Sequence, residues 1–339
     1  MQKKQNYNIA IAGATGAVGI EMIQTLEKRN FPVGELRLLA SARSVGKELE
    51  FKGKKIAVQE LTQDSFKDID IALFSAGGDR SKEFADAAVA AGAVVIDNSS
   101  AFRMTDGVPL VVPEVNPEAV KNHKGIIANP NCTTIIMLVA VNPIHKINPI
   151  KRITVSSYQA VSGAGAMALE ELRTQQKDLV EGRQPKAEIF SHVIVNNVFS
   201  HDSKILENGF NQEEYKMVQE TKKILGDQSI EVAPTCVRVP IERAHSESIS
   251  LELTQPVDFS AVTKVLNEAP GVKIMDDRQE NHFPMPLDVA GKYETFVGRV
   301  RADLDRANVL HCFVCGDQLL KGAALNAVQI AELLANDVA

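Results

Sequence analysis

The sequence contains no tryptophan, and aromatic residues make up only 5% of its 339 residues. Its four cysteines are too few for a disulfide framework in a chain of this length. The longest apolar run, 135–141, is far too short to cross a bilayer. The N-terminus has no apolar stretch followed by a cleavage site, so no signal peptide is expected. These absences predict a cytoplasmic protein that does not interact with membranes.

An excess of positive charge is also missing. The chain has 37 Lys and Arg against 43 Asp and Glu, which gives a formal net charge of -6. Such a balance offers no electrostatic attraction for nucleic acid or anionic membranes, so a small molecule is the expected partner. At 339 residues the chain exceeds the usual size of a single hydrophobic core. We therefore expect two domains.

Two of the cysteines, Cys312 and Cys315, match a CxxC motif. They fall within 309–316, an apolar segment that predicts a buried strand. Residues three apart on a strand point to opposite faces, which does not suit a shared metal or a redox pair. We interpret them as core cysteines, and no metal site is expected.

The first 130 residues alternate short apolar runs with helical patterns, which is typical of a parallel sheet built from βαβ units. The expected strands are 8–12, 36–40, 69–75, 93–97 and 125–129, and the expected helices are 17–28 and 81–91, the latter capped by Ser81. This pattern predicts a Rossmann-type, doubly wound dinucleotide-binding domain over residues 1–131.

In the rest of the chain the expected strands and helices do not alternate regularly. This pattern indicates an α+β domain over 132–317, for catalysis, substrate binding and oligomerisation. The expected strands are 153–159, 248–253, 295–300 and 309–316, and the expected helices are 133–141, 166–180, 211–225 and 259–267. Most of 319–334 is apolar. We expect the C-terminal segment 318–339 to pack back on the first domain.

The segment Gly13-Ala-Thr-Gly-Ala-Val-Gly19 lies where a predicted strand ends and a helix begins. Backbone amides and the helix N-terminus can hold a pyrophosphate at such a position. After the second strand, an acidic residue favours NAD and a basic one favours the 2′-phosphate of NADP. The chain has Arg43 there, flanked by Ser41 and Ser44. We therefore predict NADP as the cofactor.

Cys132 follows a predicted strand and begins a predicted helix. Helix dipole and free amides stabilise a thiolate there and lower the pKa of a thiol from about 8.5. A cysteine nucleophile combined with a nicotinamide cofactor indicates aldehyde oxidation through a thiohemiacetal and an acyl thioester. That chemistry needs a base, and His245 is accompanied by arginines. Spacing alone leaves other candidates open, namely His192, His201 and His311.

Taken together, these motifs resemble the aspartate-semialdehyde dehydrogenase family, from Asn8 to the C-terminal helix. The matching blocks in the first half are Gly13 to Gly19, Asp97-Asn-Ser-Ser-Ala-Phe-Arg103, Val112-Pro-Glu-Val-Asn116 and Asn129-Pro-Asn-Cys-Thr-Thr134. Those in the second half are Ser157-Tyr-Gln-Ala-Val-Ser-Gly-Ala-Gly165, Glu213-Glu-Tyr-Lys216, Arg238-Val-Pro240 with His245, and Gly316-Asp-Gln-Leu-Leu320.

The resemblance implies a role for each matching residue in the reaction. Cys132 forms the acyl-enzyme, His245 takes the thiol proton, and Gln159 lies beside the thiol and positions the acyl group. The substrate would be bound through its α-carboxylate and amino group by Arg238 and Glu213. The phosphate would be bound by Arg103 and Lys216.

The resemblance also implies which residues hold NADP and which reaction follows. The implied cofactor-binding residues are Gly13, Thr15, Gly16, Ala17, Val18, Arg43, Ser44, Ser162, Gly163 and Gln318. The implied reaction converts L-aspartate 4-semialdehyde, phosphate and NADP reversibly to 4-phospho-L-aspartate and NADPH. In the reductive direction it serves lysine, diaminopimelate, threonine and methionine biosynthesis. Family members are homodimers or homotetramers.

Three alternatives remain open. An N-acetyl-γ-glutamyl-phosphate reductase would share the architecture, but its cysteine segment usually reads Asn-Pro-Gly-Cys, whereas this chain has Asn131 before the cysteine. A glyceraldehyde-phosphate dehydrogenase fits the motifs less well. From another class, the chain could be a non-catalytic NADP-sensing protein that keeps the fold alone. A sensor needs only the glycine loop, whereas this sequence also carries a thiol, a histidine and several arginines.

Overall fold

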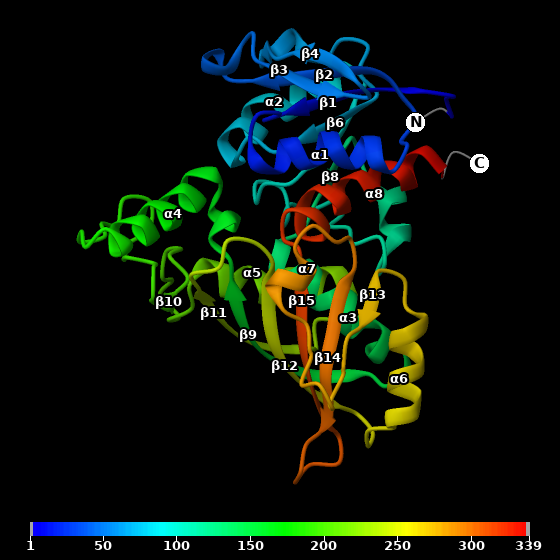
Figure 1. The fold of residues 1–339 in the computed structure, drawn as a ribbon. Coiled ribbons are helices and arrows are strands. Elements are labelled where there is room, and N and C mark those ends of the chain that lie inside the picture. Colours follow the sequence, from blue (N-terminus) through cyan, green and yellow to red (C-terminus); the bar gives the residue numbers. More distant parts are fainter. Residues whose placement is uncertain (1–2, 337–339) are drawn as a thin grey trace. The chain divides into compact units, whose positions relative to one another are not determined.

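The computed structural model describes residues 3–336, which form two units (Figure 1). The first unit contains residues up to Asn131 and those from Ala323 onward, and the second contains Cys132–Gly322. The sequence had suggested a division after 317, five residues earlier than the observed one. The last residues of the predicted C-terminal segment, 337–339, lie outside the described part, as do residues 1 and 2.

The first unit is built on a six-stranded sheet in the order β5-β2-β1-β6-β7-β8. The strands are β1 (Tyr7–Ala12), β2 (Val33–Ala40), β5 (Gln59–Glu60), β6 (Ile71–Phe74), β7 (Val94–Asp97) and β8 (Ile126–Ala128). Every pairing is parallel. The strand order reverses beside β1, and such a reversal is where α/β sheets bind their ligands. A small hairpin, β3 (Glu48–Phe51) with β4 (Lys54–Ala57), lies outside this sheet.

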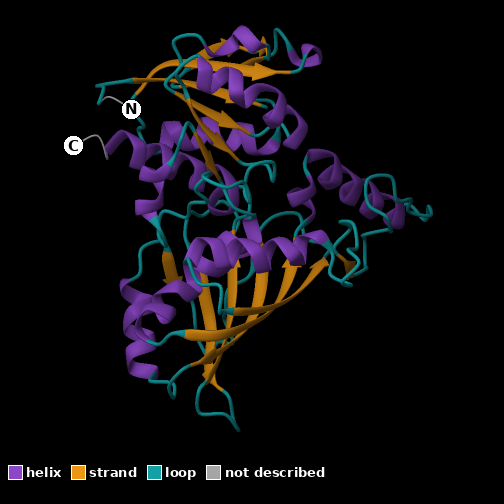
Figure 2. Cartoon of the chain, turned by 180° about the vertical axis from the view of Figure 1, so that it is seen from behind, coloured by secondary structure: helices purple, strands orange, loops and turns teal. Residues whose placement is uncertain are grey.

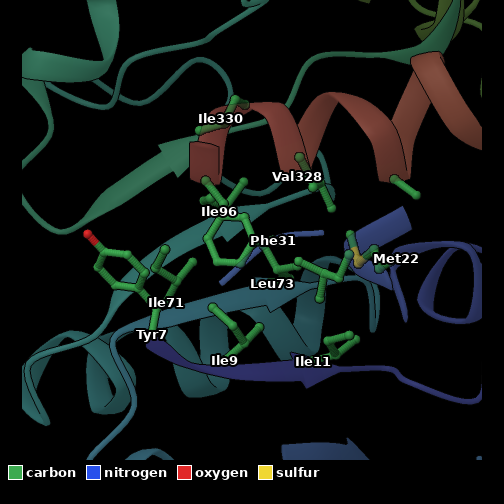
Figure 3. Close-up of a cluster of buried hydrophobic side chains, with 14 of the residues drawn as sticks. Tyr7, Ile9, Ile11, Met22, Phe31, Ile71, Leu73, Ile96, Val328 and Ile330 are labelled. Carbon is green, nitrogen blue, oxygen red and sulfur yellow. The ribbon is translucent and has the colours of Figure 1, made fainter. Parts of the chain in front are cut away.

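Apolar side chains on β1 point alternately to the two faces of the sheet, which explains why helices cover both faces. Ile9 and Ile11 point to one face, toward α1 (Ala17–Lys28) and the C-terminal helix α8 (Leu325–Asn336) (Figure 3). Ala10 and Ala12 point to the other face, toward α2 (Gly78–Ala90). Successive residues of a strand face opposite sides, so a strand that is apolar throughout must be covered by helices on both. The expected doubly wound fold is confirmed.

The second unit is built on a seven-stranded mixed sheet in the order β10-β11-β9-β12-β15-β14-β13 (Figure 2). The strands are β9 (Ile150–Gln159), β10 (Phe199–Ser200), β11 (Glu231–Arg238), β12 (His245–Leu253), β13 (Val272–Ile274), β14 (Thr295–Ala302) and β15 (Val309–Gly316). β11 pairs parallel with β9, and β12 pairs antiparallel with both β9 and β15.

Helices pack on the apolar face of this sheet. α3 (Cys132–Ile147) contacts β9, β12, β14 and β15, with α5 (Gln212–Leu225) and α6 (Phe259–Glu268) beside it. The remaining helices are α4 (Ala166–Val180) and the short α7 (Pro286–Val289). The opposite face carries a row of exposed or partly exposed side chains across four strands, namely Thr235, Ser156, Ser248 and Phe313.

Three local predictions were wrong. Ser81 does not cap α2, because the helix begins at Gly78 and the Ser81 hydroxyl instead donates to Asp97 Oδ1 at 2.6 Å. The helix expected over 133–141 continues to Ile147 with Pro143 inside it, since eleven of its residues are buried and packing outweighs the lost hydrogen bond. The strand β11 was missed because Pro234 lies within it.

Candidate active site

Cys132 is the first residue of α3 and is half-buried. Its Sγ lies 3.9 Å from the hydroxyl oxygen of Thr133. That hydroxyl in turn accepts a hydrogen bond of 2.6 Å from Nε2 of Gln159, the last residue of β9. A Cβ on Gly322 would come within 2.8 Å of the cysteine Cβ, so only glycine fits beside this residue. The start of α3 and the end of β9 thus fix the surroundings of the thiol.

Arg238 ends β11 at the position paired with Gln159, because the two parallel strands are in register there. Its guanidinium is 3% exposed. Nη1 donates to the carbonyl oxygen of Ala160 at 3.1 Å, and Nη2 donates to Asp202 Oδ1 at 3.1 Å and contacts His201 Nε2 at 2.9 Å. The arginine is therefore held in one orientation at the edge of the sheet.

His245 begins β12 and is fully buried. Its Nδ1 accepts a hydrogen bond of 3.0 Å from the backbone amide of Ala160. Burial, and after it the nearby Arg238 charge, lowers the pKa of His245 to about 3. A Cβ on Gly163 would lie 3.2 Å from His245 Nε2, so a glycine lets the backbone pack closely against this side of the ring. The imidazole is uncharged at neutral pH.

Glu213 and Lys216 lie near the start of α5, three residues apart. The Glu213 carboxylate is buried, accepts from Gln159 Nε2 at 3.2 Å and pairs with Lys216 Nζ at 3.2 Å. The lysine side chain is about one third exposed, so its ammonium can reach solvent. Both residues, which the family resemblance implied, thus lie in the same cluster as Gln159.

Gln318 and Ser162 form a second group beside His245. Gln318 Oε1 accepts from the amide of Ala244 at 2.8 Å, and its Nε2 donates to Ser162 Oγ at 2.6 Å. The serine hydroxyl donates in turn to the carbonyl oxygen of Glu242. These contacts fix the backbone that precedes His245, where Ala244 has a φ of 73°.

The glycine loop of the first unit follows β1. Gly13 has a φ of 88°, and a Cβ there would lie 2.4 Å from the Ser75 carbonyl oxygen. A Cβ on Gly19 would lie 2.2 Å from the Gly13 oxygen, so both positions require glycine. Gly16 is the N-cap of α1, which begins with Ala17 and Val18. The first turn of this helix contains no acidic residue. Amides at this helix start are therefore available to an anion.

Four further residues of the first unit lie at the same carboxyl edge of the parallel sheet. Thr15 Oγ1 lies 3.4 Å from Ser44 Oγ, in the turn after β2 that also holds the exposed Arg43. Arg103 is 8% exposed, with Nε donating to the Asn129 carbonyl and Nη2 to the Asn98 carbonyl, each at 2.9 Å. Arg103 belongs to the first unit and Lys216 to the second.

Other groups behave as structural residues. Cys312 and Cys315 are both buried on β15, as predicted, and burial raises the pKa of each thiol to about 12. Within residues 3–336 no cluster of His, Cys, Asp or Glu is suited to a metal ion. No helix in that range is long and apolar enough to cross a membrane.

Sequence reasoning missed Thr133, Ala160 and Glu247. Glu247 is fully buried on β12, on the same face as His245, and burial raises the pKa of its carboxyl well above the usual range. The alternation from His245 to Leu253 could have placed it on the apolar face. Ala160 acts through its backbone, so its side chain gives no signal.

Comparison with known proteins agrees with this geometry. Residues 8–123 match the model of the semialdehyde dehydrogenase NAD binding domain, and residues 141–321 match that of its dimerisation domain. An aspartate-semialdehyde dehydrogenase from Synechocystis is 55% identical over 96% of both chains. The chain belongs to the aspartate-semialdehyde dehydrogenase family. The family that the motifs resembled is thereby confirmed.

Solved structures of the family superpose on the whole chain. An aspartate semialdehyde dehydrogenase II from Vibrio cholerae, complexed with ASA, is 46% identical with a TM-score of 0.96 and covers 98% of this chain and 99% of its own. The enzyme from Candida albicans, solved with NADP, is 25% identical with a TM-score of 0.77, over 98% and 100% of the two chains. The chain is thus an oxidoreductase of this family with an NAD(P)-binding domain.

Proposed function

We propose that the protein catalyses the reversible, NADP-dependent conversion of L-aspartate 4-semialdehyde and phosphate to 4-phospho-L-aspartate. The observation that carries this proposal is the cluster around Cys132. The start of α3 supplies the thiol, the ends of β9 and β11 supply an amide and a guanidinium, the start of β12 supplies an imidazole, and α5 supplies a carboxylate. The reductive direction would serve lysine, diaminopimelate, threonine and methionine biosynthesis, as expected for the family.

Cys132 acts as the nucleophile. Amides at the start of α3 favour negative charge, so a thiolate is stabilised at this position. In the reductive direction the thiolate attacks the acyl carbon, the bond to phosphate breaks, and the released phosphate takes a proton from water. Bound NADPH would supply a hydride to the carbon of this thioester, and Cys132 would then leave as the thiolate as the carbon–sulfur bond breaks and the aldehyde is released. Gln159 and His245 act on the reacting carbonyl.

The substrate is held by charges of both signs. The rigid fork of Arg238 suits the α-carboxylate, and the buried Glu213 carboxylate suits the amino group. Lys216 and Arg103 bind phosphate, one through a mobile ammonium and the other through a guanidinium that backbone carbonyls orient. These roles assign a function to nearly every buried charge of the cluster.

The cofactor is NADP, held by the first unit. The loop from Gly13 to Val18 takes the pyrophosphate, while Arg43 and Ser44 take the 2′-phosphate, because no acidic residue competes at the end of β2. Ser162, Gly163 and Gln318 are the proposed contacts of the second unit with the cofactor. The NADP in the Candida albicans relative supports this choice over NAD.

The second unit also forms the subunit interface of a homodimer, in line with its match to the dimerisation domain. The face opposite α3 carries the row of exposed and partly exposed side chains that includes Ser248 and Phe313. A dimer or a tetramer built from such dimers is the expected assembly. Sedimentation velocity gives the state directly, and a monomer at all concentrations would contradict the proposal.

The proposed activity is tested by nicotinamide absorbance with NADP and phosphate. Aspartate 4-semialdehyde, N-acetylglutamate semialdehyde and glyceraldehyde 3-phosphate are offered separately, and phosphate is omitted as the control. Phosphate-dependent NADPH formation with aspartate semialdehyde alone is expected. Activity with one of the other two aldehydes instead would assign the enzyme to a different substrate. No activity from folded protein that still binds NADP would favour a sensor.

A further inference from the structure

Thr133 directly follows the proposed nucleophile on α3, and its side chain is fully buried. Its hydroxyl oxygen lies between two groups of the site, with Cys132 Sγ at 3.9 Å and Gln159 Nε2 at 2.6 Å. The family resemblance implied no role for this threonine, and the proposed mechanism does not use it. A buried hydroxyl in contact with the nucleophile can nevertheless change the charge that the sulfur carries.

The side-chain amide of Gln159 fits the site in one orientation only. Its Nε2 lies 3.2 Å from Glu213 Oε1, and that carboxylate is paired with Lys216 Nζ at 3.2 Å. A carboxylate in an ion pair is an acceptor, so the group that faces it is the NH2 of the amide. Turned over, the amide would place its oxygen against a carboxylate oxygen in a buried site. Nε2 therefore also faces Thr133 and donates to its hydroxyl oxygen.

The bond from Gln159 restricts the direction of the Thr133 hydroxyl proton. A hydroxyl has one proton and two lone pairs, and one lone pair accepts from Nε2. The O–H bond is therefore directed away from Gln159, and Cys132 Sγ lies within its reach. A neutral thiol accepts only weakly. A thiolate is a charged acceptor, so its hydrogen bond to the same hydroxyl is shorter and stronger.

We propose that the Thr133 hydroxyl donates a hydrogen bond to the Cys132 thiolate and stabilises the form of the nucleophile that attacks the substrate, while Gln159 and Glu213 fix the direction of that bond. This inference rests on the proposed function, in which Cys132 is the nucleophile. It adds a side-chain donor to the amides at the start of α3, which also favour the thiolate. The threonine keeps its proton throughout, so no step of the reaction passes through it.

Replacing Thr133 by valine leaves the charges of the site unchanged, because both side chains are neutral. The charged or titratable groups that the second unit contributes to the cluster are Glu213, Lys216, Arg238 and His245. Lys321 is buried in the turn whose Gly322 packs against the Cys132 Cβ. None of these groups is altered in the variant. A change in the titration of the thiol therefore reports the loss of the hydroxyl.

The titration of Cys132 tests this hydrogen bond in the full-length protein without substrate. The rate of alkylation by iodoacetamide is recorded against pH, and its midpoint reports the pKa of the thiol. Cys132 is the one cysteine that is not buried, and peptide mass confirms the modified residue. We expect Thr133→Val to raise the midpoint by about one pH unit and to slow alkylation about tenfold below it. Thr133→Ser keeps the hydroxyl and should restore the parent midpoint.

Thr134→Val is the matched control, because it makes the same change one residue further along α3 and should leave the midpoint at the parent value. Thr133→Ala removes the hydroxyl with a smaller side chain and should shift the midpoint as Thr133→Val does, which covers a valine variant that does not fold. An unshifted midpoint in the folded Thr133 variants would overturn the proposal. Equal shifts in both valine variants would also overturn it, since they would assign the effect to the helix start. None of these results involves turnover, so they are separate from the test of the proposed function.

Discussion

The Arg238 guanidinium donates to the carbonyl oxygen of Ala160 over 3.1 Å, and the amide of that same alanine holds His245. One peptide segment therefore sets the positions of the proposed carboxylate-binding and carbonyl-binding groups. Arg238→Lys keeps the charge but cannot contact Ala160, His201 and Asp202 at once. We expect kcat/KM for aspartate semialdehyde to fall by about 10- to 100-fold, the loss of one to two charge-assisted hydrogen bonds.

Steady-state kinetics with calorimetric NADP binding checks this expectation. Cofactor affinity should stay unchanged, because Arg238 is not among the proposed contacts of the cofactor. Arg173→Lys is the matched control, since that arginine makes an exposed ion pair with Glu242 and should be replaceable. Equal activity of the two variants would show that the buried fork has no role in substrate binding.

Gly163→Ala should impair turnover more than stability. The added Cβ would lie 3.1 Å from His245 Cε1 and 3.4 Å from Arg238 Nη1, and both of these groups are fixed by Ala160. The methyl group covers the side of the ring where the substrate oxygen is expected. We predict a fall in kcat of about tenfold, with the thermal midpoint changed by only a few degrees. Unchanged kinetics would mean that substrate approaches His245 from elsewhere.

The sequence predicts the functional groups of this site that are side chains, but not those that are backbone atoms. Cys132, Gln159, Arg238 and His245 carry distinctive side chains within recognisable blocks, and the structure brings these four residues to adjoining element ends. The strand that ends at Arg238 was missed, because its proline obscures the alternation. Backbone groups give no sequence signal, so the decisive contact of the Ala160 amide could only come from coordinates.

The fold was more predictable than its details. Apolar side chains on both faces of β1 require a parallel sheet that is covered by helices on both sides. The glycines after β1 require a tight turn, and neither requirement depends on the surface residues. The boundaries of the helices were less predictable. α2 begins at Gly78 and not at Ser81, and α3 continues beyond Pro143 because its side chains are buried. Tertiary burial decided these cases, and it is not a local property of the chain.

Glu247→Gln should stabilise the protein at neutral pH. The folded pKa of this carboxyl is raised by burial, whereas the unfolded value is about 4.3. Below pH 4 both states are protonated and there is no penalty. Above it the unfolded chain ionises first, so folding is opposed by up to about 1.4 kcal/mol per pH unit until the folded pKa is reached. The neutral glutamine removes this penalty.

Chemical denaturation at several pH values measures the effect. The variant should gain about 1 to 3 kcal/mol at pH 7, an advantage that grows with pH and vanishes near pH 4. Glu252→Gln on the same strand is the control, because its carboxylate is partly exposed, pairs with Arg306 and should change stability little. A loss of stability at pH 7 in Glu247→Gln would indicate an ionised, partnered carboxylate.

Arg43→Glu should weaken NADP binding selectively. The residue is exposed in the turn after β2, so the substitution does not disturb packing. A carboxylate there repels the 2′-phosphate and can accept from the ribose hydroxyl of NAD. We expect the Kd for NADP to rise by about 10- to 100-fold, measured by calorimetry, with the Kd for NAD unchanged or lower. Equal losses for both cofactors would place the 2′-phosphate elsewhere.

The central claim, an acyl thioester on Cys132, is tested most directly by rapid mixing of enzyme, NADP and aspartate semialdehyde without phosphate. We predict a burst of NADPH that stops when every site is acylated, and an aspartyl adduct on Cys132 in the intact mass. Added phosphate should then discharge the adduct and restart turnover. An enzyme that turns over with phosphate, yet shows neither the burst nor the adduct without it, would contradict the account.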